Sequence, residues 1–466
     1  MPTYDDLLEE IKELRQRCAE QERRIKQLER DNERLTELLE ESRRAAKRQS
    51  APFSKGEPKA DPKKPGRKSG LQHGRHGHRQ PPRPEQIDEV HEAPLPAACP
   101  GCHGPIELIE VKTQYQGEIP RRPIYRQFNV HIGRCCDCGR RVQGHHPLQT
   151  SDALGAAGSQ LGAQAQAAVV QLNKDAGLSH GKVSAVFGSL FGLSLSRGAV
   201  ARIVLRVAAR LEPTYRAIER SMPAQPFVTP DETGWRVGGR RAWLHVLVGP
   251  LVTCYRIAFS RGYDVPESIL GAGYQGQLIH DGWAPYDRFE QAIHQQCLAH
   301  LLERCRHLLE VATRGAVRFP RQVMGLLEDA LDLRDRFLDG EVSDHGLAVA
   351  RGRLRSRTVR LLKWPRLNAA NERLAAHLAR HEDQLFTFLE HPGLDATNWR
   401  AEQALRPAVV NRKVWGGNRT PDGAEAQSIL MSVLRTCRQQ QRDAFEFVSQ
   451  VLCGRRPRLK LLPGGP

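Results

Sequence analysis

Two short segments with the pattern of strands each carry an acidic residue, and these acids are the first sign of chemistry in the sequence. LIHDGWAPY (278–286) is an apolar run that ends in Asp281, and Asp231 ends a similar run in TPDETGW. A third acid, Glu402, lies in NWRAEQALRP, which reads as a helix. Carboxylates brought together from two strand ends and a helix would bind two Mg²⁺ or Mn²⁺ ions, which prefer oxygen ligands. Such a site would support in-line phosphoryl transfer.

Glu232 competes with Asp231 for the first position in this site. Successive side chains on a strand point to opposite faces, so the two acids cannot both face the metals without a twist. Asp231 is the preferred ligand. An aspartate at a strand end is also a common turn or helix-cap residue, so spacing alone does not establish the site.

Two Cys-x-x-Cys pairs predict a structural zinc site. Cys99 and Cys102 form CPGC, and Cys135 and Cys138 repeat the two-residue gap within CCDC. Four thiolates suit a closed tetrahedral Zn²⁺ site. Cys136 is a rival to Cys135 for the register of the second pair. A redox pair is the alternative, but two pairs and the lack of a βαβ pattern weigh against it.

The formal net charge of +17 asks for an anionic partner, and much of it lies in one segment. Residues 43–84 contain 13 Lys and Arg against two acids and almost no apolar residues. Such a segment cannot form a core, so we predict a disordered basic linker over 43–90. It would bind nucleic acid phosphates without sequence preference, although a plain soluble spacer is the alternative.

Residues 4–42 carry an uninterrupted heptad repeat, with Ile and Leu at most core positions and Asn32 at an a position. This pattern predicts a parallel dimeric coiled coil over 1–42, and hence a homodimer or higher oligomer. A single amphipathic helix packed on the body is the alternative. The N-terminus does not resemble a signal peptide, and the most apolar window (242–259) is interrupted by Gly and Pro. We therefore expect a cytoplasmic, nucleoid-associated protein with no membrane contact.

Residues 155–212 are helical in pattern, with apolar positions at helical spacing on each side of Gly192 and an N-cap at Ser194 or Ser196. Two helices joined by a short turn are candidates for a DNA-binding helix-turn-helix domain. A helical hairpin packed in a core is the alternative. The second helix would present three basic side chains to DNA: Arg197, Arg202 and Arg206.

Beyond this region the pattern changes to strands, and then to helices again. We predict an α/β catalytic core from 224–300 and 395–452, interrupted by an all-α insertion at 301–394, after a zinc-binding module at 91–150. The fold class is thus multidomain α+β. The block NWRAEQALRPAVVNRKVWGGNR (398–419) mixes cations with an aromatic ring that could stack on a base and with glycines that let backbone approach phosphate. Its candidate DNA-binding residues are Arg406, Arg412, Lys413, Trp415 and Arg419.

The motifs DETGW, HDGWAPY, CLAH and ALRP followed by WGG closely resemble the bacterial insertion-sequence transposases of the TnpC type. These belong to the DDE superfamily. The resemblance implies a ribonuclease-H-like core with Asp231, Asp281 and Glu402 as its metal-binding triad, and it extends over nearly the whole chain. His300, in a Cys-x-x-His motif with Cys297, would support the site. The departures are Trp399 and Gln403, where the family pattern suggests Asn-like and Arg residues.

This resemblance implies a transposase that uses Mg²⁺ or Mn²⁺ to cut DNA at the ends of an insertion sequence and join them to target DNA. Accessory proteins encoded by the same insertion sequence are expected partners. Two alternatives stay open: a nuclease of the same fold that does not join strands, and a catalytically inactive DNA-binding protein derived from a transposase. All three acids and every motif block are present, which weighs against the inactive form.

Overall fold

The computed structural model describes residues 81–116, 123–155, 160–312, 314–391 and 393–462, together with positions 16–18, 20–22, 24, 25, 27, 28 and 31. The other residues of the predicted coiled coil (1–42) and residues 43–80 of the predicted linker lie outside this part. The chain divides into two compact units, Met1–Gly117 and Glu118–Pro466. The described positions between 16 and 31 are helical and exposed. No helix in the described part is long and apolar enough to cross a membrane.

Beyond these helical positions, the regular structure of the smaller unit among its described residues is the short 3-10 helix η2 (Pro84–Gln86). In the larger unit the first strands are β1 (Ile132–Arg134) and β2 (Arg141–Gln143), an exposed antiparallel pair on either side of CCDC. This hairpin is the only sheet outside the central one in the part that the structure describes. It holds the second cysteine pair in a fixed turn.

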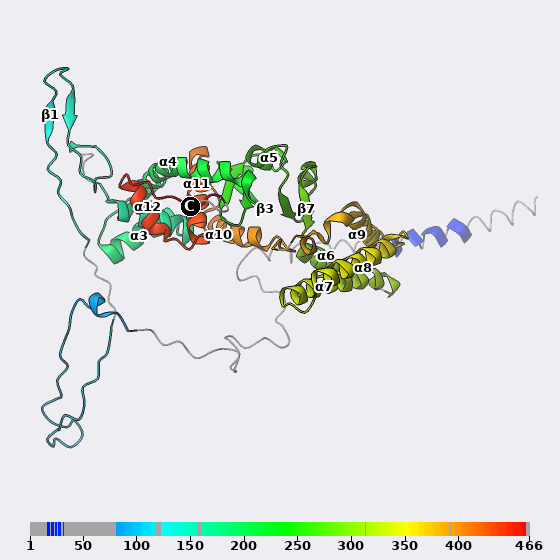
Figure 1. Ribbon diagram of the computed structural model, residues 1–466, viewed down its shortest axis with the longest axis horizontal. Coiled ribbons are helices and arrows are strands. Elements are labelled where there is room, and N and C mark those ends of the chain that lie inside the picture. Colours follow the sequence, from blue (N-terminus) through cyan, green and yellow to red (C-terminus); the bar gives the residue numbers. More distant parts are fainter. Residues whose placement is uncertain are drawn as a thin grey trace, which may run out of the picture. The chain divides into compact units, whose positions relative to one another are not determined.

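The larger unit is built around a mixed five-stranded sheet with the order β5-β4-β3-β6-β7; its strands β3 and β7 are labelled in Figure 1. The three antiparallel strands are β3 (Phe227–Val237), β4 (Arg240–Val248) and β5 (Thr253–Ala258). Two short parallel strands follow: β6 (Gln277–His280) pairs with β3, and β7 (Ile293–Gln296) pairs with β6. Strand β3, which comes first of these five along the chain, therefore lies at the centre of the sheet.

Helices cover both faces of this sheet. Leu247 of β4 belongs to one hydrophobic core, whereas its neighbours Val246 and Val248 belong to another, as the alternation of side chains along a strand requires. The second core is closed by α10 (Trp399–Trp415). The first core contains α2 (Ala163–Val170), α3 (His180–Phe191), α4 (Arg197–Ser221), α5 (Asp264–Leu270) and α12 (Ala444–Leu452).

Helix α11 (Pro421–Gln439) covers the outer edge of the sheet. Ser428, Ser432 and Thr436 are spaced four residues apart and so lie in one row along the helix. Their hydroxyl oxygens accept hydrogen bonds of 2.8 to 3.1 Å from three backbone N–H groups of β5. Side chains thus satisfy the free edge of β5, which otherwise could pair with another chain.

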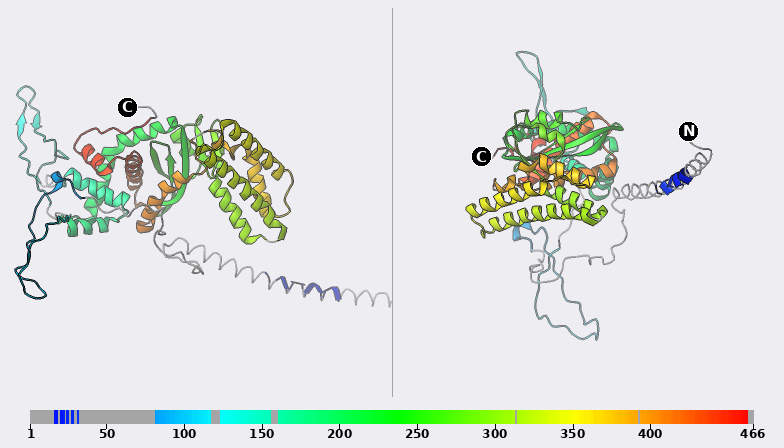
Figure 2. Two further views of the ribbon diagram at one scale, coloured as in Figure 1. Left: turned by 60° about the horizontal axis from the view of Figure 1, so that its bottom comes forward. Right: turned by 90° about the vertical axis from the view of Figure 1, so that its right-hand side faces the viewer.

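The remaining helices form a separate bundle (Figure 2). This bundle has its own hydrophobic core. Its helices are α6 (Leu298–Val311), α7 (Arg318–Leu338), α8 (Asp344–Leu362) and α9 (Ala369–Arg380). The chain leaves the sheet after β7 and returns before α10, and the two crossings are neighbours, because Leu298 N–H donates to the Ala396 carbonyl at 3.0 Å. A long insertion can therefore be accommodated without separating the parts of the sequence around it.

Candidate functional site

The sheet brings Asp231 and Asp281 to the same level. Phe227 pairs with Gln277 and Val228 with Leu278 in parallel register, so the same count along both strands aligns Asp231 with Asp281. Asp281 directly follows the last residue of β6, as expected from the sequence. Asp231 does not end its strand, and that expectation was wrong. It lies inside β3, because β3 continues as a hairpin with β4 after its pairing with the shorter β6 has stopped.

Asp231 occupies an unfavourable position for a charged group. Burial, with the nearby negative charges of Glu232 and Asp281, raises the pKa of Asp231 to about 7. The Glu232 backbone N–H, which donates to Asp231 Oδ1 at 2.7 Å, and the positive charge of His300 oppose this rise. A mostly buried carboxylate beside a second one is an arrangement that a cation would relieve.

Glu232, the competing acid, is fully engaged by protein groups. Its side chain is only 4% exposed and accepts from Arg261 at 2.8 Å and from the Tyr286 hydroxyl at 2.9 Å. The Arg261 guanidinium lies over the Trp283 ring, 3.9 Å from its centroid. Glu232 thus joins β3 to the segment after β6. Its partners neutralise the charge and leave no oxygen directed freely toward a metal, unlike Asp231.

His300, on α6, links the sheet acids with Glu402, which lies in the first turn of α10. Its Nε2 lies 3.7 Å from Glu402 Oε1. The neighbouring Cys297 side chain, together with the negative charges of Asp281 and Glu402, raises the pKa of His300 to about 9 against the opposing effect of burial, although His300 Nδ1 has no hydrogen-bond partner among the described residues. The His300 imidazole therefore lies beside Glu402 and within electrostatic reach of Asp231 and Asp281.

Cys297 has a structural position. It is buried, and its Sγ makes contacts of 3.1 and 3.3 Å with the side-chain Oδ1 and backbone N–H of Asn398, the N-cap residue of α10. This contact ties the start of α6 to the start of α10. It explains how His300 and Glu402, about 100 positions apart in the sequence, come to lie together.

The donor set suits a hard divalent ion in chemical type, since all three acids supply oxygen. As the side chains lie, no group of three or more His, Cys, Asp or Glu residues in the described part is arranged to hold a metal. Glu402 faces His300 instead. The site therefore combines the expected ligands with a histidine that takes up part of their charge.

The basic residues after Glu402 divide into two kinds. Arg406, Lys413 and Arg419 are exposed. Arg412 instead donates to Thr233 Oγ1 at 3.1 Å and to a β3 carbonyl, and so attaches α10 to the sheet. This position favours a structural role for Arg412 over a phosphate contact.

Trp415 and Gly417 also pack against the protein, whereas Gly416 is exposed. The Trp415 ring is partly buried, and Lys174 Nζ lies 5.6 Å from its centroid. A Cβ at Gly417 would lie 2.4 Å from the Arg236 carbonyl oxygen. The close approach that requires glycine is therefore made to β3, whereas the sequence suggested an approach to phosphate.

The two helices proposed to bind DNA are joined as expected. Helix α3 ends at Gly192 in left-handed backbone (φ 64°), and Ser196 caps α4 by accepting from the Ala199 N–H at 3.1 Å. One face of α4 is buried in the core that it shares with the sheet, as in the helical-hairpin alternative. The opposite face is exposed and carries the three expected basic residues, Arg197, Arg202 and Arg206.

The two cysteine pairs form matching turns, one in each unit. In both, the carbonyl of the first cysteine accepts from the N–H four residues on, at 2.8 and 3.0 Å. The first cysteine's own N–H donates to the carbonyl five residues on, at 3.0 and 2.9 Å. Hydrogen bonds from the backbone N–H groups of Cys102 and Cys138 are the main cause of a lowered pKa at Cys99 and Cys135. In these turns Cys135, rather than Cys136, corresponds to Cys99.

Lys174 is a buried cation that the sequence did not reveal. It lies in the π-helical turn Gln171–Asp175 after α2, and its Nζ donates to Gln427 Oε1 at 2.5 Å. Burial lowers the pKa of Lys174 to about 7. The stretch QLNKDAG gave no signal of this, because burial of the lysine depends on the later helices α10 and α11. A different segment, KWPR (363–366), does carry a signal in the sequence, because it places an aromatic ring between two cations, a composition typical of nucleic acid contacts.

Comparison with known proteins gives two findings. A sequence profile of the family described as "Transposase IS66 family" matches residues 158–426, more than half of the chain, and this span contains all three acids. The chain is also similar to uncharacterized protein y4jO of Sinorhizobium fredii, with 33% identity over 67 residues. That match covers 14% of this chain and only 21% of the relative, and its printed name states no function.

Proposed function

The chain belongs to the transposase IS66 family, and from this premise we propose that it cuts and joins DNA strands by metal-dependent phosphoryl transfer at insertion-sequence ends. The observation that supports the proposal is that His300 lies 3.7 Å from Glu402 and within electrostatic reach of Asp231 and Asp281. Acids from a central strand, a neighbouring strand end and a helix are the arrangement that two-metal phosphoryl transfer needs. Conversely, a purely structural site would leave Asp231 paired, as Glu232 is.

The strand order supports a ribonuclease-H-like core for this chemistry. Three antiparallel strands followed by two parallel ones, with the first strand central, match the architecture that the sequence resemblance implies. The acids on β3 and after β6 then occupy adjacent positions on neighbouring parallel strands. Helix α10 brings Glu402 to the same end of these strands through its contact with α6.

Mg²⁺ or Mn²⁺, when bound, would activate the attacking oxygen and stabilise the leaving oxygen. Asp231, Asp281 and Glu402 would hold it. The chain's own contribution is orientation: the Gly282–Trp283 turn fixes Asp281 through a 3.0 Å hydrogen bond from the Trp283 N–H. Protonated His300 would compensate the charge of the acids before metal binds and could contact a DNA phosphate afterwards.

DNA binding is proposed for the exposed cations rather than for every basic residue of the last block. Arg406, Lys413 and Arg419 are available to phosphates, whereas Arg412 is engaged by β3. The exposed face of α4, with Arg197, Arg202 and Arg206 in the first half of the helix, is a second candidate surface. We also propose dimerisation through residues 1–42 and a requirement for accessory proteins.

We test the catalytic proposal by cleavage and strand transfer of an oligonucleotide from the insertion-sequence end, with accessory proteins supplied. Asp231→Asn, Asp281→Asn and Glu402→Gln should each lower the cleavage rate about 10³-fold or more, since metal stabilises the transition state by several kcal/mol. DNA affinity should be nearly unchanged. Glu232→Gln is the matched control and should keep much of the activity.

Several outcomes would change this assignment. Cleavage by Asp281→Asn at the unaltered rate would remove the two-metal proposal. If Glu232→Gln were inactive and Asp231→Asn active, Glu232 would replace Asp231 as the first metal ligand and the rest of the proposal would stand. Cleavage without strand transfer would favour a nuclease, and binding without either reaction would favour an inactive DNA-binding protein.

A zinc site is proposed for the cysteine turns. Thiolates of Cys99, Cys102, Cys135 and Cys138 would hold about one Zn²⁺ per chain, measured by elemental analysis. The matching turns support Cys135 as the ligand, so Cys135→Ser should lose zinc and Cys136→Ser should retain it. The reverse result would correct the register. Full zinc retention by both variants would remove the four-thiolate site.

A further inference from the structure

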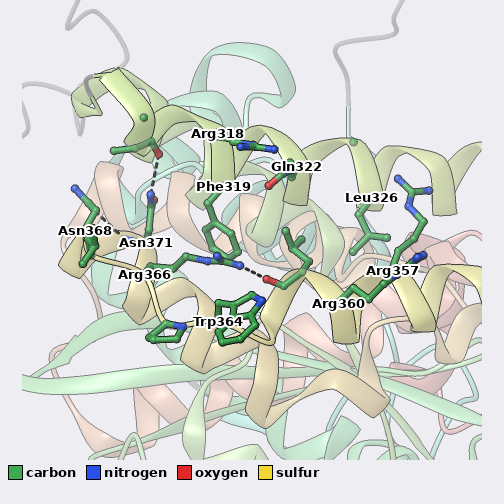
Figure 3. A pocket seen from close by; sticks show the side chains of 16 residues that line it. Arg318, Phe319, Gln322, Leu326, Arg357, Arg360, Trp364, Arg366, Asn368 and Asn371 are labelled. Atoms are coloured by element: carbon green, nitrogen blue, oxygen red, sulfur yellow. Dashed lines mark hydrogen bonds between the residues drawn. The ribbon is translucent and has the colours of Figure 1, made fainter.

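The helical bundle contains a cavity of about 960 Å³ between the starts of α7 and α9 and the end of α8 (Figure 3). This volume is at the upper end of the range of small-molecule sites. Its floor includes Phe319 and Leu326, which are 5% and 3% exposed. The cavity is lined by residues of α7 and α8 and of the segments next to them, up to the start of α9. None of the three acids, Asp231, Asp281 and Glu402, lies on these elements. The cavity is therefore a separate feature that the proposed reaction does not explain.

The residues that line this cavity include four arginines and no acid. Arg357 is paired with Asp329 outside the lining, at 2.6 Å. Arg318 and Arg360 are exposed and make no ion pair with any described residue; Arg360 only donates to the Ser356 carbonyl at 3.2 Å. Two cations are thus left uncompensated at the rim, which favours an anionic occupant.

Arg366 adds a cation that is already partly dehydrated. Its guanidinium lies over the Phe319 ring, 4.5 Å from the centroid, and it also donates to the Leu361 carbonyl. Its Nε is buried and has no hydrogen-bond partner among the described residues. An unpartnered buried N–H in an arginine-lined cavity is a donor for which an acceptor from a ligand would be favourable.

An aromatic ring stands at the mouth of the same cavity. Trp364 is 65% exposed, and Lys363 Nζ lies 5.3 Å from its centroid. Pro365 follows it in a short connection to α9, so the backbone here has little freedom. An exposed indole among cations has the composition of a site that stacks a nucleobase while neighbouring groups bind its phosphates.

We propose that this cavity, the arginine pocket, binds an unpaired nucleotide of a DNA strand. Trp364 would stack on the base, Arg318 and Arg360 would bind the adjacent phosphodiesters, and Arg366 would donate to an acceptor within the cavity. An unpaired base is required because the ring faces of a base-paired nucleotide are covered by its neighbours in the duplex. The proposal rests on the proposed function only in taking DNA as the partner of the chain.

The test is equilibrium binding of the full chain, in EDTA so that no cleavage occurs, to a fluorescent single-stranded oligonucleotide of mixed sequence and to its duplex. Trp364→Ala should weaken single-strand binding about tenfold, since one base–aromatic stack contributes on that order. Duplex affinity should change by less than about twofold, because a paired base does not reach the ring. Trp364→Phe, which keeps a ring, should restore most of the loss.

Arg353→Gln is the matched control for the cations. Arg353 is exposed on α8 but does not line the cavity, so its substitution should have less effect on single-strand binding than Arg360→Gln. Melting temperatures verify that each variant folds. Equal losses on single strand and duplex for Trp364→Ala, or no loss on either, would overturn the proposal; no loss would direct attention to a protein partner for the pocket. The two proposals can fail separately. If single-strand binding depends on Trp364 but the chain does not cleave DNA, this inference stands and the proposed function fails.

Discussion

The carboxylate cluster (Asp231, Asp281 and Glu402 around His300) and the arginine pocket each bring together charges of one sign. The electrostatic cost to the folded protein is high in the cluster and low in the pocket. The cluster lies within the fold, where Asp231 is mostly buried and its pKa is raised. The pocket keeps Arg318 and Arg360 at an exposed rim, where water and salt screen them. The difference indicates that the cluster stores unfavourable electrostatic energy in the free protein, whereas the exposed arginines at the rim of the pocket hardly affect stability.

The largest expected effect follows from this stored energy. The folded chain keeps the proton of Asp231 up to about pH 7, whereas the unfolded chain releases it near pH 4. Folding is therefore increasingly penalised as pH rises between these values. Without metal, Asp231→Asn should stabilise the protein by about 2 to 4 kcal/mol above pH 7, and by little at pH 4.

Denaturant unfolding in EDTA at pH 4 and pH 8 measures this difference. Asp329→Asn is the comparison from the pocket side, since Asp329 is exposed and pairs with Arg357; it should change stability by less than about 1 kcal/mol. An Asp231→Asn variant that is less stable than the unaltered chain at pH 8 would show that the carboxylate is not under electrostatic strain.

Metal should relieve the same strain. A divalent ion that binds only the folded chain stabilises it by about 2.7 kcal/mol at a hundredfold excess over Kd. Mg²⁺ should therefore raise the melting temperature of the unaltered protein and of Arg318→Gln, but not that of Asp281→Asn. An equal rise in Asp281→Asn would mean that the ion binds elsewhere, and no rise in any variant would contradict the metal site.

Gly282 tests the structural link between the cluster and the helical bundle. It follows Asp281 with φ 84°, and a Cβ there would lie 2.6 Å from Gln296 Oε1 and 2.8 Å from a ring carbon of His377 on α9. Gly282→Ala should cost about 1 to 3 kcal/mol and displace Asp281, with loss of cleavage. Gly271 has a similar φ of 82° but open space around it, so Gly271→Ala separates backbone strain from the close contact. Equal costs for both would exclude the contact as a cause.

The placement of Asp281 after a strand and of Glu402 on a helix could be predicted from the sequence, because the signals for these elements are local. Asp281 ends a run of strand formers, and Glu402 lies in a helical block with a specific motif. Where Asp231 sits along β3 could not be predicted in the same way, because the point at which pairing with β6 stops depends on the length of another strand. Likewise, only the packing of α10 against β3 reveals that Arg412 and Gly417 serve the fold.

The arginine pocket is the opposite case. Arg318 and Arg360 are separated by 42 positions, and each lies among other charged residues on an amphipathic helix, where exposed arginines are ordinary. Their approach depends on how α7 packs on α8 and on the connection that carries Trp364. Periodicity gives the buried face of each helix but not which exposed positions of two helices meet. The burial of Lys174 likewise depends on packing between distant segments, because its partner Gln427 lies on α11.

The smallest expected effect on stability comes from the pocket and is paired with a clear effect on binding. Arg318→Gln and Arg360→Gln remove exposed cations without ion-pair partners in the described part, so each should change the unfolding free energy by no more than about 0.5 kcal/mol. If each neutralises one phosphate of a single strand, each substitution should reduce the slope of log K against log salt by about 0.7, and the double variant by about twice that. Titrations at several salt concentrations measure the slope, with Arg353→Gln as the unchanged reference. A slope that stays constant in the double variant would mean that these arginines do not contact phosphate. A loss of stability comparable with the gain expected for Asp231→Asn would mean that the pocket arginines support the fold, and the contrast between the two regions would fail.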